Sequence, residues 1–129
     1  MPRTAEDLET YLLQLNRRFE NDRGTYVITG GEEVPPIALR VAGPVIALHV
    51  SIGPVPKDDA HKVRVFTRLL ELNATDLMHA SYGIEDGTIV LSSALVLDTL
   101  DLNELEAALS DIDLALARHI SALHDLAKS

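Results

Sequence analysis

Hydrophobic residues recur at intervals of three and four in the first twenty residues of the chain. The positions are Leu8, Tyr11, Leu12, Leu15 and Phe19. This spacing places side chains on one face of an amphipathic helix. Thr4 is suited to cap the start of the helix, and the polar run up to Gly24 is suited to end it. The pattern therefore predicts a helix over residues 4–21, with an apolar face that meets either the core or a partner.

The pattern then changes to the two-residue alternation of β-strands. Strand candidates cover residues 25–29, 37–42 and 45–52, and each is followed by glycine or proline residues that favour turns. One face of the third candidate is entirely apolar, with Ile46, Leu48, Val50 and Ile52. The three segments predict an antiparallel meander with one strongly apolar face.

A second helix is predicted from Asp58 or Asp59 to Asn73. Either aspartate can cap the helix start, and Asn73 tolerates the left-handed conformation that often ends a helix. The apolar positions of this helix are Val63, Phe66, Leu69, Leu70 and Leu72. Its polar side is basic and carries Lys62, Arg64 and Arg68.

A hairpin follows the second helix. Residues 78–84 and 88–97 alternate in side-chain character, and Glu85-Asp86-Gly87 joins them. The Asp-Gly pair favours a two-residue turn with positive φ angles. The second strand of this hairpin has apolar or small residues on both faces, which indicates a central strand covered on both sides.

The last segment is a long helix that begins at Asp101. Asp101 and Glu104 have capping-box spacing, in which two side chains satisfy free backbone N–H groups at the helix start. The helix is predicted to run to about Leu126. Its apolar stripe consists of Leu102, Leu105, Leu109, Ile112, Leu116, Ile120 and Leu123. Leu114 and Leu126 lie off this stripe and indicate a second apolar contact surface.

The predicted element order is α-β-β-β-α-β-β-α. This order predicts an α+β fold in which helices pack on a five-stranded antiparallel sheet. The 129 residues fit a single domain that spans residues 1–129. Because aromatic residues make up only 4% of the chain, the core must consist mainly of aliphatic side chains.

The charge and composition exclude several classes of function. The net charge of −9 and pI near 4.8 repel phosphate groups, so we expect neither a nucleic-acid partner nor membrane insertion. The chain has no cysteine, which removes disulfides and thiolate chemistry. Its N-terminus lacks the apolar run of a signal peptide, and no segment reaches the roughly 20 apolar residues of a membrane span. We therefore expect a cytoplasmic protein.

The sequence shows no arrangement typical of a catalytic or metal site. His119 and His124 would point about 140° apart on a helix, so they do not form a ligand pair, and the histidines are predicted to lie at the surface. Asp111 and Asp113 would diverge by about 200° on the same helix. We predict no catalytic residue, cofactor or metal. A small enzyme that uses a cleft between the sheet and the helices remains an alternative.

Residues 69–109 resemble the Tir-chaperone-like superfamily, which includes the class I type III secretion chaperones and YbjN-type proteins. The resemblance rests on short motifs: Leu69-Leu70-Glu71-Leu72-Asn73, Tyr82-Gly83-Ile84, Gly87 with Ile89-Val90-Leu91, Leu97-Asp98-Thr99-Leu100-Asp101, and Glu104-Leu105. The order of elements is similar along nearly the whole chain. The resemblance implies a homodimer that binds extended segments of client proteins without ATP. A YbjN-like regulatory or adaptor protein with no secretion client is the alternative within this superfamily.

Two sets of residues are candidates for contact with partners. For the client, the candidates are Leu8, Leu12, Leu15 and Phe19 on the first helix. For a dimer or other partner, the candidates are Arg64, Arg68, Leu114 and Leu126. The first set could instead form the core, and the two arginines could instead form an ordinary solvated face.

Overall fold

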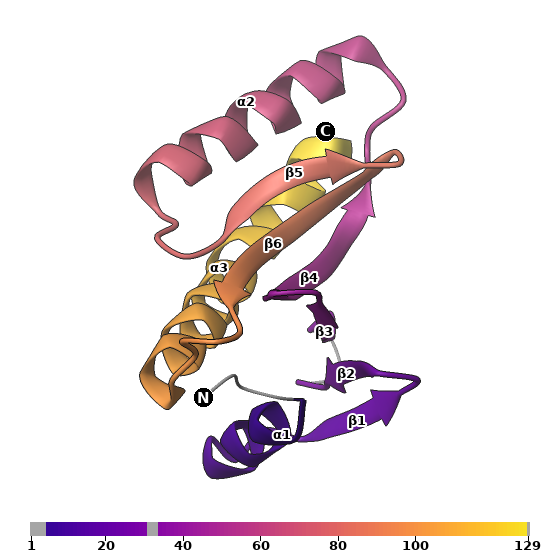
Figure 1. Ribbon diagram of the computed structural model, residues 1–129. Helices are drawn as coiled ribbons and strands as arrows, with labels where there is room; N and C mark the ends of the chain where they lie inside the picture. The colour runs from indigo at the N-terminus through magenta and orange to yellow at the C-terminus, as the bar shows by residue number, and fades with distance from the viewer. Residues whose placement is uncertain (1–4, 31–33, 129) are drawn as a thin grey trace.

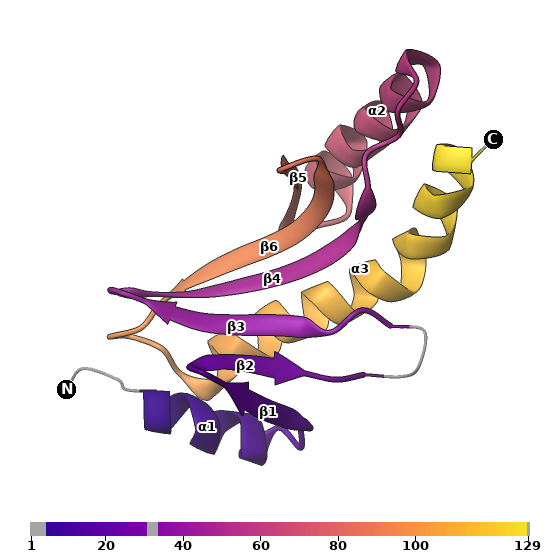
Figure 2. The ribbon, with the colours of Figure 1, turned by 90° about the vertical axis from the view of Figure 1, so that its right-hand side faces the viewer.

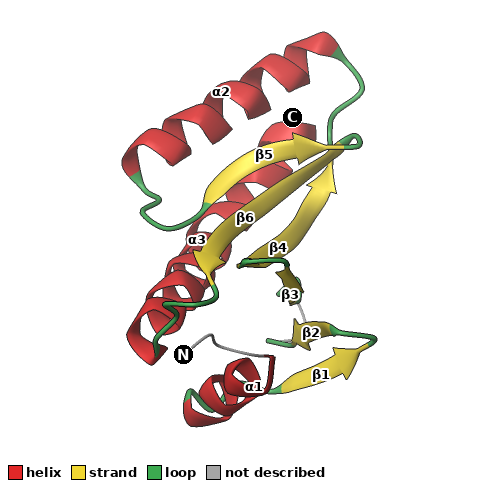
Figure 3. Ribbon diagram, viewed as in Figure 1, coloured by secondary structure: helices red, strands yellow, loops and turns green. Residues whose placement is uncertain are grey.

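The computed structural model describes residues 5–30 and 34–128, which form three helices and six strands (Figures 1 and 3). In chain order the elements are α1 (Ala5–Gln14), β1 (Phe19–Asp22), β2 (Thr25–Ile28), β3 (Ile37–Ala42), β4 (Val45–Pro54), α2 (Asp59–Thr75), β5 (Ser81–Glu85), β6 (Thr88–Val96) and α3 (Leu102–Lys128). The α+β class is confirmed. Thr4, the expected cap of the first helix, lies outside the described residues.

The sheet has six strands in the order β1-β2-β3-β4-β6-β5, and every pair of adjacent strands is antiparallel. The prediction of five strands is wrong because the first helix ends at Gln14, well before residue 21. Asn16 has a φ of 57°, which turns the chain out of the helix, and residues 19–22 then pair with β2. A tight turn at Arg23 and Gly24, with φ angles of 53° and 91°, closes this additional hairpin.

The helices cover one face of the sheet, and the other face is open. On the covered face, Leu39 lies opposite Leu48 and Val50 lies opposite Leu91, and all four side chains are fully buried. Figure 2 looks onto the open face, with α3 running behind the strands. The predicted meander with one strongly apolar face is therefore confirmed.

The second helix begins where Asp58 caps it by accepting a hydrogen bond from the His61 N–H. Its buried residues are Val65, Leu69 and Leu72, whereas Val63 and Leu70 are 64% and 69% exposed. The predicted stripe is thus partly wrong, because α2 packs mainly against α3 and β5 and leaves the side that carries Val63 and Leu70 uncovered. The helix also continues past Asn73 to Thr75.

The second hairpin and the last helix follow local sequence signals closely. Asp86 and Gly87 have φ angles of 49° and 75°, which confirms the predicted turn. The strand before the turn begins at Ser81 and not at residue 78. β6 lies inside the sheet as predicted, but no described helix covers its second face. The Asp101 carboxylate accepts a hydrogen bond from the Glu104 N–H at 2.7 Å, which confirms the predicted cap of α3.

Candidate protein-binding surfaces

One edge of the sheet is closed by a side chain. The amide of Asn73 on α2 contacts the backbone of Tyr82 on the edge strand β5: its Oδ1 accepts from the Tyr82 N–H at 2.7 Å, and its Nδ2 donates to the Tyr82 C=O at 3.1 Å. This pair of bonds reproduces what a neighbouring strand would make at that residue. Asn73 therefore blocks the β5 edge at Tyr82 instead of ending the helix as the sequence suggested.

The other edge of the sheet is β1, and it is open. The Thr29 N–H donates to the Arg18 C=O at 3.1 Å, and this bond fixes which residues of β1 face β2. Because bonded and non-bonded pairs alternate in an antiparallel ladder, Glu20 bonds to β2 while Phe19 and Asn21 direct their backbone groups away from the sheet. β1 is the terminal strand of the described sheet. Its backbone can therefore accept a further strand.

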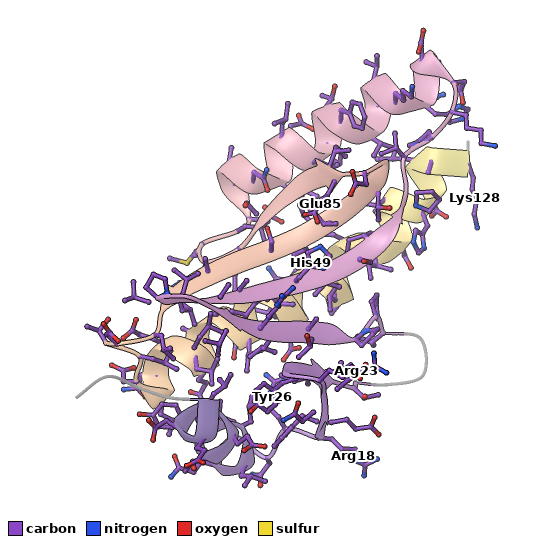
Figure 4. The ribbon with its side chains drawn as sticks, turned by 45° about the vertical axis from the view of Figure 1, so that its right-hand side comes forward. Arg18, Arg23, Tyr26, His49, Glu85 and Lys128 are labelled. Atoms are coloured by element: carbon purple, nitrogen blue, oxygen red, sulfur yellow. The ribbon has the colours of Figure 1, made fainter. Side chains whose placement is uncertain are left out.

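The side chains along β1 differ on the two faces of the sheet. Phe19 lies on the covered face, beside the ring of Tyr26 at a centroid separation of 5.8 Å. Glu20 and Asp22 lie on the open face and are exposed. Arg18 and Arg23 flank the strand in sequence (Figure 4). A strand added at this edge would meet an apolar side chain on one face and two carboxylates on the other.

The structure divides the residues predicted to bind a client. Leu8 and Leu12 are fully buried in the core of the chain itself, so they are not accessible to a client in this conformation. Leu15 and Phe19 are partly buried beside that core. Of the predicted client residues, only Phe19 lies at the open strand edge.

A second candidate surface is apolar and spans α2 and β5. We define the α2–β5 surface as Val63, Phe66, Leu70 and Ile84. Val63, Leu70 and Ile84 are among the exposed large hydrophobic residues of the described chain, and Phe66 is partly buried. A recess of about 230 Å³ lies within this surface and is lined by Phe66, Leu70, Tyr82 and Ile84, among others. An exposed apolar group of this kind is typical of a contact surface.

The residues predicted for a dimer or partner surface lie on two helices and differ in exposure. Arg64 and Arg68 lie on α2, where Arg68 is 3.8 Å from the carboxylate of Glu71. Leu114 on α3 is 52% exposed, whereas Leu126 is partly buried against the core. The exposed apolar residues Val63 and Leu70 of α2 belong instead to the α2–β5 surface defined above.

A buried polar cluster joins β5, α3 and the end of α2. The His119 side chain is only 6% exposed; its Nδ1 lies 2.8 Å from the Tyr82 hydroxyl, and its Nε2 lies 3.0 Å from Asp76 Oδ2. The prediction that this histidine lies at the surface is wrong. The spacing of residues 112, 116, 119 and 123, which places His119 on the apolar stripe of α3, is the signal that could have identified it.

The environment of this cluster shifts two pKa values. The hydrogen bond from His119, followed by one from Thr75, lowers the pKa of the Asp76 carboxyl below its ordinary value. Burial, followed by the charges of Asp76 and Asp111, raises the pKa of Tyr82. The hydrogen bonds of this cluster connect β5, α3 and the end of α2 and stabilise their packing.

The two aspartates near the middle of α3 also hold neighbouring segments. One Asp111 oxygen accepts hydrogen bonds from the backbone N–H groups of Met78, His79 and Ala80 at 2.9–3.2 Å. Asp113 forms an ion pair with Arg17 at 2.7 Å. The two carboxylates therefore diverge as predicted and serve separate structural contacts.

The described residues bear on three types of site: metal centre, catalytic cleft and membrane span. Residues 5–30 and 34–128 contain no group of three or more His, Cys, Asp or Glu side chains that could hold a metal ion. Beside the first half of α3, the space between the sheet and this helix, where an active-site cleft was the alternative, is filled by buried residues such as Leu48, Leu105 and Leu109. Within the described helices, none is long and apolar enough to span a membrane.

The described residues form an α+β fold in which helices cover one face of a six-stranded antiparallel sheet. The chain belongs to the CesT_Tir_1 family, whose sequence pattern it matches over residues 1–129. This match, together with the structures described next, confirms the resemblance to the Tir-chaperone-like superfamily. A comparison with curated protein sequences finds no match.

Solved structures share the fold at low sequence identity. A chain of the ExoU–SpcU heterodimeric complex, from the type III secretion system of Pseudomonas aeruginosa, is 22% identical with a TM-score of 0.66, over 92% of this chain and 96% of that chain. YbjN from E. coli, described as a proposed transcription regulator, is 12% identical with a TM-score of 0.65, over 88% of each chain. The HopA1–SchA chaperone–effector complex contains a chain that is 12% identical, with a TM-score of 0.61, over 85% of this chain and 87% of that chain.

Proposed function

We propose that this protein is a non-enzymatic chaperone or adaptor that binds extended segments of client proteins, as a homodimer and without ATP. The open edge of β1 is the observation that carries this proposal, because an extended segment can add to it as a seventh strand. Membership of the CesT_Tir_1 family and the likeness to chains of the ExoU–SpcU heterodimeric complex and the HopA1–SchA chaperone–effector complex support a protein client.

The β1 edge also indicates the kind of segment that fits. Backbone groups of Phe19 and Asn21 supply the hydrogen bonds, which are independent of the client sequence. Side chains of the added strand alternate between the faces of the sheet. A client with apolar residues beside Phe19 and basic residues beside Glu20 and Asp22 would complement both faces.

The α2–β5 surface is the proposed contact between two copies of the chain. Val63, Leu70 and Ile84 expose apolar area that a second copy would cover, and a two-fold interface uses the same surface on both subunits. This surface lies at the β5 end of the sheet, whereas β1 forms the opposite end. Dimer formation through the α2–β5 surface therefore leaves both β1 edges accessible.

The likeness to YbjN supports one alternative, a regulatory or adaptor protein with no secretion client. Both versions require a protein partner and the same strand edge. They differ in the identity of the partner, which an affinity purification from native lysate followed by mass spectrometry would supply.

The strand-addition proposal is tested with two substitutions at one residue. Asn21→Pro removes a backbone N–H that faces away from the sheet, whereas Asn21→Ala retains it. Both variants lose the hydrogen bond from the Gly24 N–H to the Asn21 side chain, so the loss of that bond does not distinguish them. With a client segment identified by purification, we expect calorimetry to show about tenfold weaker binding for Asn21→Pro and little change for Asn21→Ala. Equal binding by the two variants would exclude the β1 edge as the client site.

A further inference from the structure

An apolar recess lies where the end of β4 and the connection to α2 meet the last turns of α3. Its volume is about 340 Å³, which falls within the range of roughly 300–1,000 Å³ typical of ligand sites. Ile52, Ile89 and Leu123 form the apolar part of its lining. We call this site the α3 recess. It belongs neither to the β1 edge nor to the α2–β5 surface.

The walls of the α3 recess offer few free backbone N–H groups. Pro54 and Pro56 have no backbone N–H, and the Val55 N–H between them donates to the Gly87 C=O at 2.9 Å. His124 Nε2 lies 3.4 Å from the Ile52 C=O. An occupant is therefore held by apolar contact and by charge, and not by pairing with the backbone.

The charges at the recess are opposite in sign to those of the chain as a whole. The net charge of the chain is −9, yet two of its three lysines, Lys57 and Lys128, line the recess. Neither has an ion-pair partner within residues 5–30 and 34–128. The neighbouring Asp58 carboxylate is already engaged by the His61 N–H and imidazole. The recess therefore favours an anionic occupant.

The two lysines lie on different walls. Lys57 is on the connection between β4 and α2, and Lys128 is at the end of α3 (Figure 4). An apolar side chain in the recess would have one ammonium group on each side. A fatty acid carries its charge at one end only, whereas a polypeptide can place a carboxylate on both sides of an apolar anchor.

We propose that the α3 recess binds a segment of a partner protein in which acidic residues flank one or two large apolar side chains. This site would be separate from the β1 edge and would have the opposite charge preference, since the exposed side chains of β1 include Glu20 and Asp22. The chain could then bind a client at the β1 edge and an acidic partner at the α3 recess. The inference does not depend on strand addition at β1.

The test uses a defined probe, a fluorescein-labelled peptide with the core Asp-Leu-Phe-Glu-Asp. Titration into the ¹⁵N-labelled protein should shift the amide signals of Gly53, Leu123 and Lys128, and fluorescence polarisation should give the affinity. Two control peptides replace either the acidic residues by lysine or the Leu-Phe pair by serine. We expect both controls to bind at least about tenfold more weakly, and binding to weaken as salt is raised.

Variants then locate the site. Lys57→Glu and Lys128→Glu should each weaken the acidic peptide about fivefold or more, whereas Lys62→Glu, which makes the same change in net charge outside the recess, should not. Asn21→Pro should leave this binding unchanged, which separates the result from the β1 proposal. Equal binding of the basic peptide, shifts confined to other residues, or equal effects of all three lysine variants would overturn the proposal. Laurate, a fatty acid, is the last control. If laurate displaces the peptide and has the higher affinity of the two, the recess is a lipid site and not a peptide site.

Discussion

At the scale of single residues, two kinds of contact hold the fold: those within one turn of the chain, and those between elements that lie far apart in sequence. Asp101 caps α3, and Asp86 and Gly87 form the hairpin turn, because both devices involve only residues adjacent in sequence. The hydrogen-bond partners of His119 could not be predicted from sequence in the same way. Its partners Tyr82 and Asp76 lie 37 and 43 positions away, and only the packing of α3 against β5 and α2 brings them together.

The cluster around His119 predicts a dependence of stability on pH. The hydrogen bond from His119 lowers the pKa of Asp76 in the folded state relative to its ordinary value of 3.8. A carboxyl group of this kind stabilises the fold above its unfolded pKa, and the stabilisation is lost as the pH falls through the folded pKa. Asp76→Asn should therefore be less stable than the parent protein at neutral pH, and this difference should shrink below about pH 4.

Chemical denaturation at a series of pH values measures this difference directly. Asp58, which caps α2, also has a lowered pKa, so the parent protein should lose stability in acid for more than one reason. The comparison with Asp76→Asn isolates the contribution of the His119 cluster. A difference that stayed constant from neutral pH to about pH 3 would contradict this account.

At the scale of elements, the periodicity gave the type of most segments and the wrong limits for some of them. The three-and-four spacing that starts at Leu8 continues to Phe19, so the pattern alone extends the first helix into residues that pair as β1. Residues 19–22 form a strand because they pair with β2. The spacing of apolar residues within this segment carries no information about that pairing. The same limitation applies to α2, where Val63 and Leu70 match an apolar stripe but face away from the core.

The burial of α3 can be tested with a matched pair of substitutions. Leu116 is 6% exposed, whereas Leu114, two residues earlier on the same helix, is 52% exposed. Leu116→Asp should lower the free energy of unfolding by about 3–5 kcal/mol, because it buries an unpaired charge in the core. Leu114→Asp introduces the same charge into solvent and should cost less than about 1 kcal/mol. Equal melting temperatures for the two variants would show that the assigned face of α3 is wrong.

The proposed role of the α2–β5 surface gives a second test at this scale. Leu70→Asp places a charge in the middle of the proposed dimer contact and should convert the protein to a monomer in light scattering. Leu13→Asp is the control, because Leu13 is 66% exposed on α1 and lies outside this surface. If the parent protein is itself monomeric at high concentration, or if Leu70→Asp remains dimeric, two copies do not join through this surface.

At the scale of the whole molecule, the arrangement separates three surfaces that differ in chemistry. One end of the sheet carries the open β1 edge, and the other is closed at Tyr82 by Asn73 and adjoins the apolar α2–β5 surface. The α3 recess belongs to neither end of the sheet and is lined by the end of β4 and the last turns of α3. The class of fold could be predicted from the sequence, since it depends on the order of elements. The separation of these surfaces could not, because it depends on which strand reaches each edge.

This separation predicts how dimer formation affects client binding. In the proposed dimer, two β1 edges are available, so a client with two suitable segments can bind both and gain affinity from the high effective concentration of the second segment. Leu70→Asp should therefore weaken binding of such a client by a factor of about ten or more. The same variant should bind a peptide with only one segment as tightly as the parent protein does, because β1 is unchanged. Calorimetry on both ligands distinguishes the cases: equal losses would place the client on the α2–β5 surface itself, and no loss with either ligand would show that the two β1 edges act independently.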